Sequence, residues 1–207
     1  MPTDFYYTSR GRGEKTVLCL HGLFGSPDNW TPVMEYLQNE FSLIALRLPL
    51  NYRDDWLDPA APEFGQLTDY VKEFVSQKNL SRVILCGNSL GGQVAIDFCW
   101  RYGEQARGLI LTGSAGLFER NLASGGFIRV DREFVEQQAG WILFNKAVIT
   151  SSYIDEIMAL LTDRRQRLFL VRLAKAASRF KVATLLGHLR LPVLIVWGRQ
   201  DAITPPE

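Results

Sequence analysis

The chain has 207 residues, of which 47% are hydrophobic and 12% aromatic, and its 23 basic and 22 acidic residues leave a formal charge of +1. This composition is ordinary for a globular protein with one substantial core. The near balance of charge argues against nucleic acid as a partner, because binding to phosphates requires clustered lysine and arginine. Its apolar runs are far shorter than the roughly 20 residues that cross a bilayer, so we expect no membrane span.

Cysteine usage and the amino-terminal residues bear on the compartment. The first ten residues lack a basic start followed by an apolar stretch, so no secretory signal is predicted. Cys19, Cys86 and Cys99 show no Cys-x-x-Cys spacing, and two of them lie in strand-like apolar runs. This pattern indicates buried thiols in a reducing cytoplasm rather than a disulfide framework or a zinc site. We expect a cytoplasmic protein that uses no metal and no organic cofactor.

Short apolar runs alternate with helical patterns in the first half of the chain, which is typical of a parallel sheet covered on both faces. Residues 16–20 are continuously apolar or β-branched, as a strand buried on both faces requires. A helical pattern follows over 30–37, and a second strand is predicted at 42–48. A loop rich in proline and acidic residues, 50–65, leads to a helix through 67–75.

The second half of the chain contains a long interruption of this alternation. Strands are predicted at 83–86, 108–112 and 193–197, with a helix that ends at about residue 102. Between 116 and 186 the apolar pattern is helical, in the segments 133–144, 153–161 and 164–186. We therefore predict an α/β core formed by residues 1–115 and 187–207, and a helical insertion formed by residues 116–186.

A Gly-x-Ser-x-Gly run directly follows the strand at 83–86. The sequence Gly87-Asn88-Ser89-Leu90-Gly91-Gly92 would place Ser89 on a sharp strand-to-helix turn, where a β-carbon on either neighbouring glycine would crowd the backbone. The helix that follows would aim unpaired N–H groups at the same place. This context predicts that Ser89 is a nucleophile, whereas a plain glycine-rich turn is the alternative.

A second loop is expected beside this turn. His21-Gly22-Leu23-Phe24-Gly25 ends the first predicted strand, and the carboxyl ends of parallel strands share one edge of a sheet. The N–H groups of Leu23 and Leu90 could then form an oxyanion hole, with Phe24 as a further possible donor. We expect the His21 ring to brace the loop by hydrogen bonds. Phe24 and Trp30 are either walls of a substrate pocket or plain core residues.

These motifs, together with Trp197-Gly198-Arg199-Gln200-Asp201 and Pro205 after a late strand, resemble the α/β-hydrolase fold family over essentially the whole chain. The helical insertion matches the cap of that family. The elbow and the Trp-Gly-Arg-x-Asp run are most similar to the meta-cleavage-product hydrolases, serine enzymes that cut carbon–carbon bonds in vinylogous diketo acids. The resemblance implies that Asp201 orients a catalytic histidine; alternatively, it caps a helix that starts near Pro205.

The sequence departs from the family in two places that bear on specificity. The second strand of the family usually ends in an Asp and a Pro-Gly-His-Gly turn, where this chain has residues 47–53, so specificity cannot be carried over from relatives there. The carbon–carbon hydrolases also carry a cap arginine that grips the substrate carboxylate. Its candidates here are Arg164, Arg165 and Arg167, and the alternative is that they form the solvated face of a helix.

The largest departure concerns the triad histidine, which in this fold follows the acid in the chain. Only Ala-Ile-Thr-Pro-Pro-Glu follows Asp201. His188 precedes the last predicted strand and so belongs to the opposite edge of the sheet from Ser89, roughly 17 to 20 Å away. We therefore expect that the carboxy-terminal part carrying the histidine is missing, with a pseudoenzyme as the alternative. An incomplete core of this kind would also expose an apolar sheet edge and be prone to association.

The sequence thus predicts a serine hydrolase that acts on a small-molecule ester or vinylogous diketone. The chain of 207 residues should be nearly inactive by itself, because loss of a triad member costs about 10⁴- to 10⁶-fold in kcat. One alternative with the same chemistry is a carboxylesterase or lipase-like enzyme. A second alternative, from another functional class, is a non-catalytic binding or scaffold protein. Aspartate-nucleophile relatives are disfavoured because serine stands at position 89. Whether the chain forms a homo-oligomer is left open.

Overall fold

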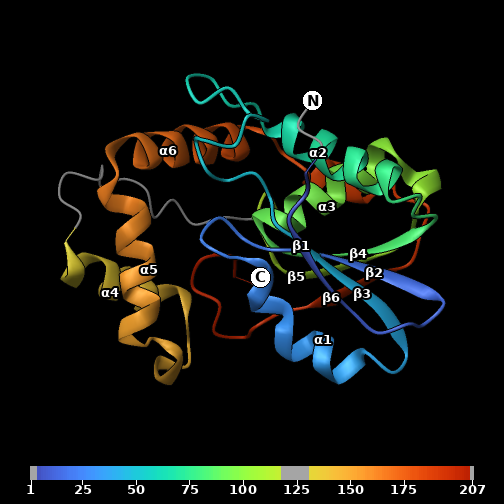
Figure 1. Ribbon diagram of the computed structural model, residues 1–207, viewed down its shortest axis with the longest axis horizontal. Helices are drawn as coiled ribbons and strands as arrows, with labels where there is room; N and C mark the ends of the chain where they lie inside the picture. Colours follow the sequence, from blue (N-terminus) through green and yellow to red (C-terminus); the bar gives the residue numbers. More distant parts are fainter. Residues whose placement is uncertain (1–3, 118–130, 206–207) are drawn as a thin grey trace.

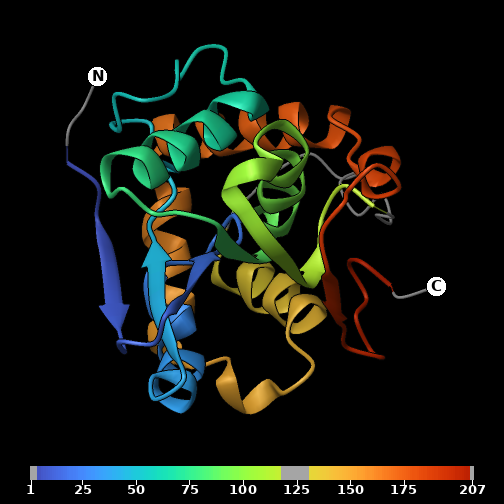
Figure 2. The same ribbon diagram turned by 90° about the vertical axis from the view of Figure 1, so that its right-hand side faces the viewer.

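A computed structural model describes residues 4–117 and 131–205 of the chain. Six strands form one sheet in the order β1-β3-β2-β4-β5-β6, which Figure 2 shows from blue to red. The neighbours from β3 to β6 pair in parallel, and β1 pairs with β3 in antiparallel register. The strands are β1 (Tyr7–Arg10), β2 (Lys15–Leu20), β3 (Phe41–Leu46), β4 (Val83–Ser89), β5 (Ala106–Ser114) and β6 (Val193–Val196).

Helices cover both faces of this sheet, with α2 and α3 on one face and α1 on the other (Figure 1). The larger hydrophobic core lies between the sheet and α2 and α3 and extends to buried side chains of α4, α5 and α6. A smaller core includes Trp30 and Met34 beside α1. No helix in the described part of the chain is long and apolar enough to cross a membrane. The helices are η1 (Pro27–Trp30), α1 (Thr31–Leu37), α2 (Phe64–Gln77), α3 (Leu90–Arg101), η2 (Gly103–Gln105), α4 (Arg132–Ile142), η4 (Lys146–Val148), α5 (Ser151–Thr162), α6 (Arg164–Arg179) and α7 (Ala183–Leu186).

The predicted strands are confirmed in place, with longer bounds for β4 and β5. The helix predicted over 164–186 is wrong as a single element, because α6 ends at Arg179 and α7 starts at Ala183. Phe180, which follows α6, has an extended backbone with φ −87° and ψ 97°, and its carbonyl accepts from Nε2 of the buried Gln93 at 2.7 Å. Residues 118–130, in the first part of the predicted insertion, lie outside the described residues.

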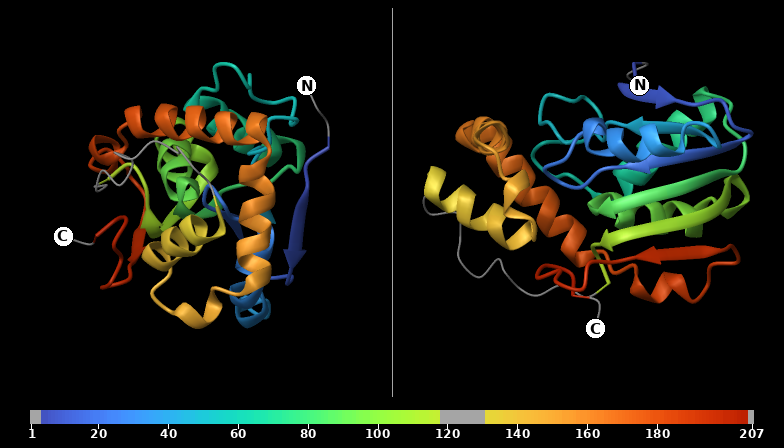
Figure 3. Two further views of the ribbon diagram at one scale, coloured as in Figure 1. Left: turned by 90° about the vertical axis from the view of Figure 1, so that its left-hand side faces the viewer. Right: turned by 90° about the horizontal axis from the view of Figure 1, so that it is seen from below.

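Helices α4 and α5 lie beyond the carboxyl edge of the parallel strands, and α6 runs back across the core (Figure 3). Two buried glutamines fasten α6 to the core. Gln166 of α6 donates to the carbonyl of Leu50 at 2.8 Å and accepts from the amide of Tyr52 at 3.0 Å. Gln93 of α3 binds the other end of α6, with Nε2 lying 2.8 Å from the Ala177 carbonyl. Helix α6 is therefore fixed at both ends by buried amide hydrogen bonds.

The order of the strands reverses between β2 and β4. After β2 the chain continues to β3 on one side, and after β3 it crosses to β4 on the other side of β2. In open α/β sheets, ligands bind outside the carboxyl ends of the strands at such a switch point. The loop after Leu20 and the turn at Ser89 both start at this place.

The side chains of the outer strand β6 are exposed along its whole length. Its four side chains are between 40% and 59% exposed, although all of them are apolar. The expectation of an exposed apolar sheet edge is therefore confirmed for this strand, and association through it stays a prediction.

Candidate active site

Ser89 ends β4 and immediately precedes α3. Its backbone has φ 51° and ψ −119°, in a region that residues with a side chain rarely adopt, and its side chain is half-buried. Asn88 donates from Nδ2 to the carbonyl of Thr112 at 2.7 Å and so ties the turn to β5. A strained serine at the end of a central strand, followed at once by a helix, has the geometry of a nucleophile elbow.

Close backbone contacts explain the glycines on either side of this serine. A β-carbon on Gly87 would lie 2.3 Å from the carbonyl oxygen of Gly91. One on Gly91 would lie 2.2 Å from the carbonyl oxygen of Leu20, at the end of β2. Both distances are far inside van der Waals contact, so the prediction that a β-carbon at either position would crowd the turn is confirmed.

The loop after β2 packs directly against the elbow. A β-carbon on Gly22 would lie 3.2 Å from Cβ of Ser89. The amide of Gly25 donates to the carbonyl of Gly22 at 3.0 Å, which closes a turn with Leu23 and Phe24 at its centre. Leu90 is the first residue of α3, where backbone N–H groups have no partner within the helix. Leu23 therefore lies in the turn that packs against the elbow and Leu90 directly follows Ser89, while their donation to an oxyanion stays a prediction.

His21 serves as a brace for these loops. Its ring is 2% exposed, with Nδ1 lying 2.8 Å from the Gly22 carbonyl and Nε2 accepting from the amide of Leu48 at 3.0 Å. Because Nε2 accepts, the neutral ring carries its proton on Nδ1. Burial lowers the pKa of His21, and the charge of Arg47 lowers it further against the opposing effect of the Gly22 carbonyl. The expected bracing role is confirmed.

Asp201 lies at the carboxyl end of the neighbouring strand β5. Its Oδ2 atom would be 3.2 Å from a β-carbon on Gly113, the residue before the register partner of Ser89. Oδ1 accepts from the amides of Ile203 and Thr204 at 2.9 and 2.8 Å, which is the pattern of a capping residue. Oδ2 accepts from the Thr204 hydroxyl at 2.9 Å. These hydrogen bonds close a turn that orients the carboxylate, and no helix begins at Asp201 within the described residues, while Oδ2 faces the end of β5.

The two predicted pocket walls lie in different surroundings. Trp30 is 7% exposed and belongs to the smaller core beside α1, so the core alternative holds for this residue. Phe24 is half-buried and packs against the edge of the larger core.

The arginine candidates on α6 lie mostly at its surface. Arg164 and Arg165 are exposed, as expected for a solvated helix face. Arg167 donates to the carbonyl of Leu161 at 2.7 Å.

A cavity of about 600 Å³, which the sequence analysis did not predict, lies beside the acid loop, the segment 197–204 that carries Asp201. Gln200 and Ala202, which flank Asp201, form one side of it. Trp141 and Phe144 come from α4 and the residues after it, and they are 54% and 73% exposed. The sequence signal for this cavity was the pair of large aromatic residues at the end of the helical segment 133–144. The helical pattern does not show which other element such residues face.

His188 lies far from this edge. It lines a smaller cavity with Arg82, Ala106 and Pro192, which begin or directly precede β4, β5 and β6. Strand β4 has seven residues, and a strand rises about 3.3 Å per residue, so the two edges are roughly 20 Å apart. The sequence-based rejection of His188 as a partner of Ser89 is confirmed.

Comparisons with known proteins agree with this geometry. A family model described as the alpha/beta hydrolase family matches residues 17–207. An uncharacterized hydrolase, YugF, of Bacillus subtilis is 21% identical, over 98% of this chain and 79% of its own length. The chain spans about half the length of two other curated relatives, 55% and 54%.

Solved structures give the same fold. An α/β hydrolase enzyme from the metagenome of sediments of the Mar Chica lagoon, Morocco, has a TM-score of 0.75 and 28% identity, covering 100% of this chain and 77% of its own. A meta-cleavage product hydrolase (CumD) of Pseudomonas fluorescens has a TM-score of 0.80 at 19% identity, covering 98% of this chain and 78% of its own.

The parallel sheet and the strained serine between β4 and α3 are features of the α/β-hydrolase fold. The chain belongs to the α/β hydrolase family.

Proposed function

We propose that this protein is a serine hydrolase that transfers the acyl group of a small-molecule substrate to Ser89 and then to water. The observation that carries the proposal is the left-handed backbone of Ser89 at the end of β4, with the turn after β2 packed against it. Such a turn holds a hydroxyl clear of the sheet at the amino end of a helix, where negative charge is stabilised.

The chemistry follows from this arrangement. Ser89 Oγ attacks the substrate carbonyl carbon, a base takes the serine proton, and the carbonyl oxygen becomes negatively charged. The N–H groups of Leu23 and Leu90 donate to that oxygen, and a single donor of this kind is worth about 3 to 4 kcal/mol in the transition state. The protonated base then gives its proton to the leaving group. In the second half of the reaction, water attacks the acyl carbon while the base takes its proton, and the base returns that proton to Ser89 Oγ as the carboxylic acid leaves.

The base that we propose for this step is a histidine, and neither histidine of the 207 residues can take the role. The sequence contains two histidines. Both ring nitrogens of His21 are engaged with Gly22 and Leu48, and His188 is at the other edge of the sheet. We assign to Asp201 the task of fixing the tautomer of the absent histidine, because its Oδ2 atom faces the end of β5 beside the elbow.

The cavity beside Asp201 supports a compact substrate with an apolar portion. Trp141, Phe144 and Ile149 give it apolar walls. Charged and polar groups are added by Glu136, Gln137, Lys146 and Gln200. Its volume of about 600 Å³ lies within the range of small-molecule sites, about 300–1,000 Å³. We propose an ester as the substrate, with a vinylogous diketone as the second candidate, favoured by the structural likeness to a meta-cleavage product hydrolase.

Chemical rescue tests this proposal on the chain as it exists. Imidazole added to the solution can act as the missing base if it diffuses to Ser89, and hydrolysis of p-nitrophenyl acetate reports the reaction. We expect imidazole to raise the rate above the sum of the rates with imidazole alone and with protein alone. The Ser89→Ala variant should lose this excess. An excess that is absent in the wild-type chain, or that persists in Ser89→Ala, would favour the non-catalytic binding or scaffold alternative.

A further inference from the structure

Two cysteines lie side by side at the centre of the sheet. Cys19 of β2 and Cys86 of β4 are register partners on adjacent parallel strands, so their Cα atoms are about 4.8 Å apart, the usual spacing of neighbouring strands. Both side chains belong to the smaller core beside α1 and so point to the same face of the sheet. Cys19 is fully buried and Cys86 is 6% exposed. The two thiols therefore share one small apolar space, although they are far apart in the sequence.

Within this space the two thiols contact each other. A hydrogen bond with the Cys86 side chain raises the pKa of Cys19, and burial raises it further. The Cys19 S–H group is therefore the donor and the Cys86 sulfur is the acceptor. Because Cys86 is also the less buried of the two, it is the thiol that a small reagent reaches first.

The spacing of the two residues suits a disulfide that carries some strain. Cα atoms joined by a disulfide are usually about 4.4–6.8 Å apart, and the spacing of paired strands falls in this range. The β-carbons of joined cysteines are about 3.8 Å apart, which is closer than the strands themselves, so the two side chains would have to tilt toward each other. A strained disulfide is reduced more readily than a relaxed one, so a bond at this place would be reversible.

We propose that Cys19 and Cys86 form a reversible disulfide when the protein meets a peroxide. The Cys86 thiolate attacks one oxygen of hydrogen peroxide, the O–O bond breaks, and the sulfur is oxidised to a sulfenic acid. Cys19 then loses its proton, attacks this sulfur and displaces the hydroxyl group as water, which forms the S–S bond. Two thiols and one hydrogen peroxide thus give one disulfide and two water molecules.

The bond would lie directly before the candidate active site along both strands. Cys86 is three positions before Ser89 on β4, and Cys19 is two positions before His21 at the end of β2. It would therefore link the strand that ends in the elbow to the strand that leads into the adjoining turn. The proposal does not depend on the hydrolase chemistry, because it concerns the two thiols alone.

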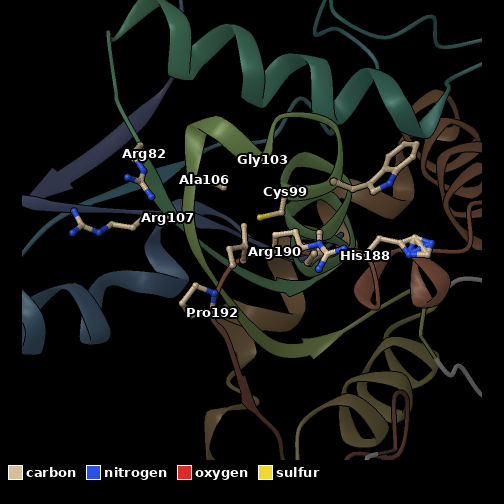
Figure 4. Close-up of a pocket in the computed structure, with 11 residues that line it drawn as sticks. Arg82, Cys99, Gly103, Ala106, Arg107, His188, Arg190 and Pro192 are labelled. Atoms are coloured by element: carbon tan, nitrogen blue, oxygen red, sulfur yellow. The ribbon is translucent and has the colours of Figure 1, made fainter.

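Cys99 provides an internal control. It lies on α3 and belongs to the larger core, on the other face of the sheet. It lines the cavity at the amino edge together with Ala106 and Pro192 (Figure 4). Burial raises the pKa of Cys99 to about 12, which keeps this residue in the thiol form that reacts poorly with peroxide.

Peroxide treatment of the folded chain, followed by capture of the remaining thiols with N-ethylmaleimide and by mass spectrometry, tests the proposal. We expect a loss of two hydrogen atoms, a peptide pair that joins Cys19 to Cys86, and a remaining thiol at Cys99. Dithiothreitol should restore all three thiols. The control is the same treatment in urea, where Cys86 should join Cys99 most often, because these two residues close the shortest loop.

Two variants separate the roles of the thiols. In Cys19→Ala, the oxidation of Cys86 should stop at the sulfenic acid, which dimedone captures. Cys86→Ala should lose most of this dimedone label, whereas Cys99→Ala should form the disulfide as the wild type does. The comparison of the folded and the urea-treated wild type does not require any of these variants to fold.

The proposal would be overturned if the folded chain formed no bond between Cys19 and Cys86 at a peroxide concentration that oxidises the unfolded chain. Bonds to Cys99 in the folded chain, or bonds between two chains, would contradict it as well. Equal dimedone labelling of Cys19→Ala and Cys86→Ala would contradict the order of the two steps.

Discussion

The two edges of the parallel sheet differ in whether their polar side chains are paired with other groups of the chain. At the carboxyl edge, the His21 ring and the Asp201 carboxylate are bonded to neighbouring groups of the chain, and glycines allow backbones to touch. At the amino edge, Arg82, Arg107 and Arg190 are exposed and take part in none of the ion pairs among the described residues. The first arrangement holds groups in fixed positions, whereas the second leaves the charges in solvent, where they contribute little to stability. Substitutions should therefore destabilise the carboxyl edge and leave the stability of the amino edge nearly unchanged.

The largest effect is expected where backbones touch. Gly91→Ala would force a β-carbon to within 2.2 Å of the Leu20 carbonyl oxygen, so the elbow and β2 must separate. We expect a loss of about 3 kcal/mol or more in the free energy of unfolding, measured by urea denaturation. Gly103→Ala is the matched control, because nothing lies within 4 Å of the added carbon. Equal stability of the two variants would contradict the close contact at Gly91.

His21→Ala should give the next largest effect. It leaves the Leu48 amide and the Gly22 carbonyl without their ring partner, at a cost of about 2 kcal/mol. His188→Ala removes an exposed histidine and should leave the free energy of unfolding nearly unchanged. A loss of the same size in both variants would show that the ring of His21 does not brace the loops.

The same histidine predicts a pH dependence. Burial lowers the pKa of His21 from its usual 6.5, so the unfolded chain binds a proton at higher pH than the folded chain does. Its contribution to stability is therefore complete above about pH 6.5 and is lost as the pH falls below that value. Urea denaturation between pH 7 and 5 should show a smaller loss of stability in His21→Ala than in the wild type. Parallel profiles would contradict this assignment.

Gln166→Ala tests how α6 is fastened to the loop after β3. The substitution removes one donor and one acceptor that Leu50 and Tyr52 use, and we expect a loss of about 1 to 2 kcal/mol in urea denaturation. Gln77→Ala, on the exposed face of α2, is the control and should change little. If both variants unfold alike, these hydrogen bonds do not hold α6 to the core.

The smallest effect is expected at the amino edge. Arg107→Gln removes an exposed charge with no ion-pair partner among the described residues, so the free energy of unfolding should change by less than about 0.5 kcal/mol. A loss of the size expected for His21→Ala would mean that Arg107 stabilises the fold, and the contrast between the edges would fail.

The parts of the molecule that could be predicted from the sequence are those with local signals. The elbow is a strand, a Gly-x-Ser-x-Gly run and a helix in direct succession, so its geometry follows from neighbouring residues. Strand β1 was missed because it is a short edge strand with two exposed residues, and such strands lack the apolar pattern of central ones.

Contacts between residues far apart in the sequence could not be predicted, because they leave no local signal. Gln93 and Gln166 reach backbone groups 84 and 116 positions away, and no local pattern marks a glutamine for such a role. The walls of the larger cavity come from α4 and from the acid loop, which meet only in the folded chain. The elbow at Ser89 was therefore predictable because it lies within one turn. The cavity was not, because its walls come from elements that are far apart in the sequence.

Labelling with a fluorophosphonate tests the central claim most directly, because this reagent forms a covalent bond with an activated serine hydroxyl. The chain would be treated in the presence of imidazole, digested and mapped by mass spectrometry. The account predicts one labelled peptide, modified at Ser89, with faster labelling when imidazole is present and no label there in Ser89→Ala. Absence of label at Ser89, or equal labelling of other serines, would contradict the claim that the elbow activates this residue.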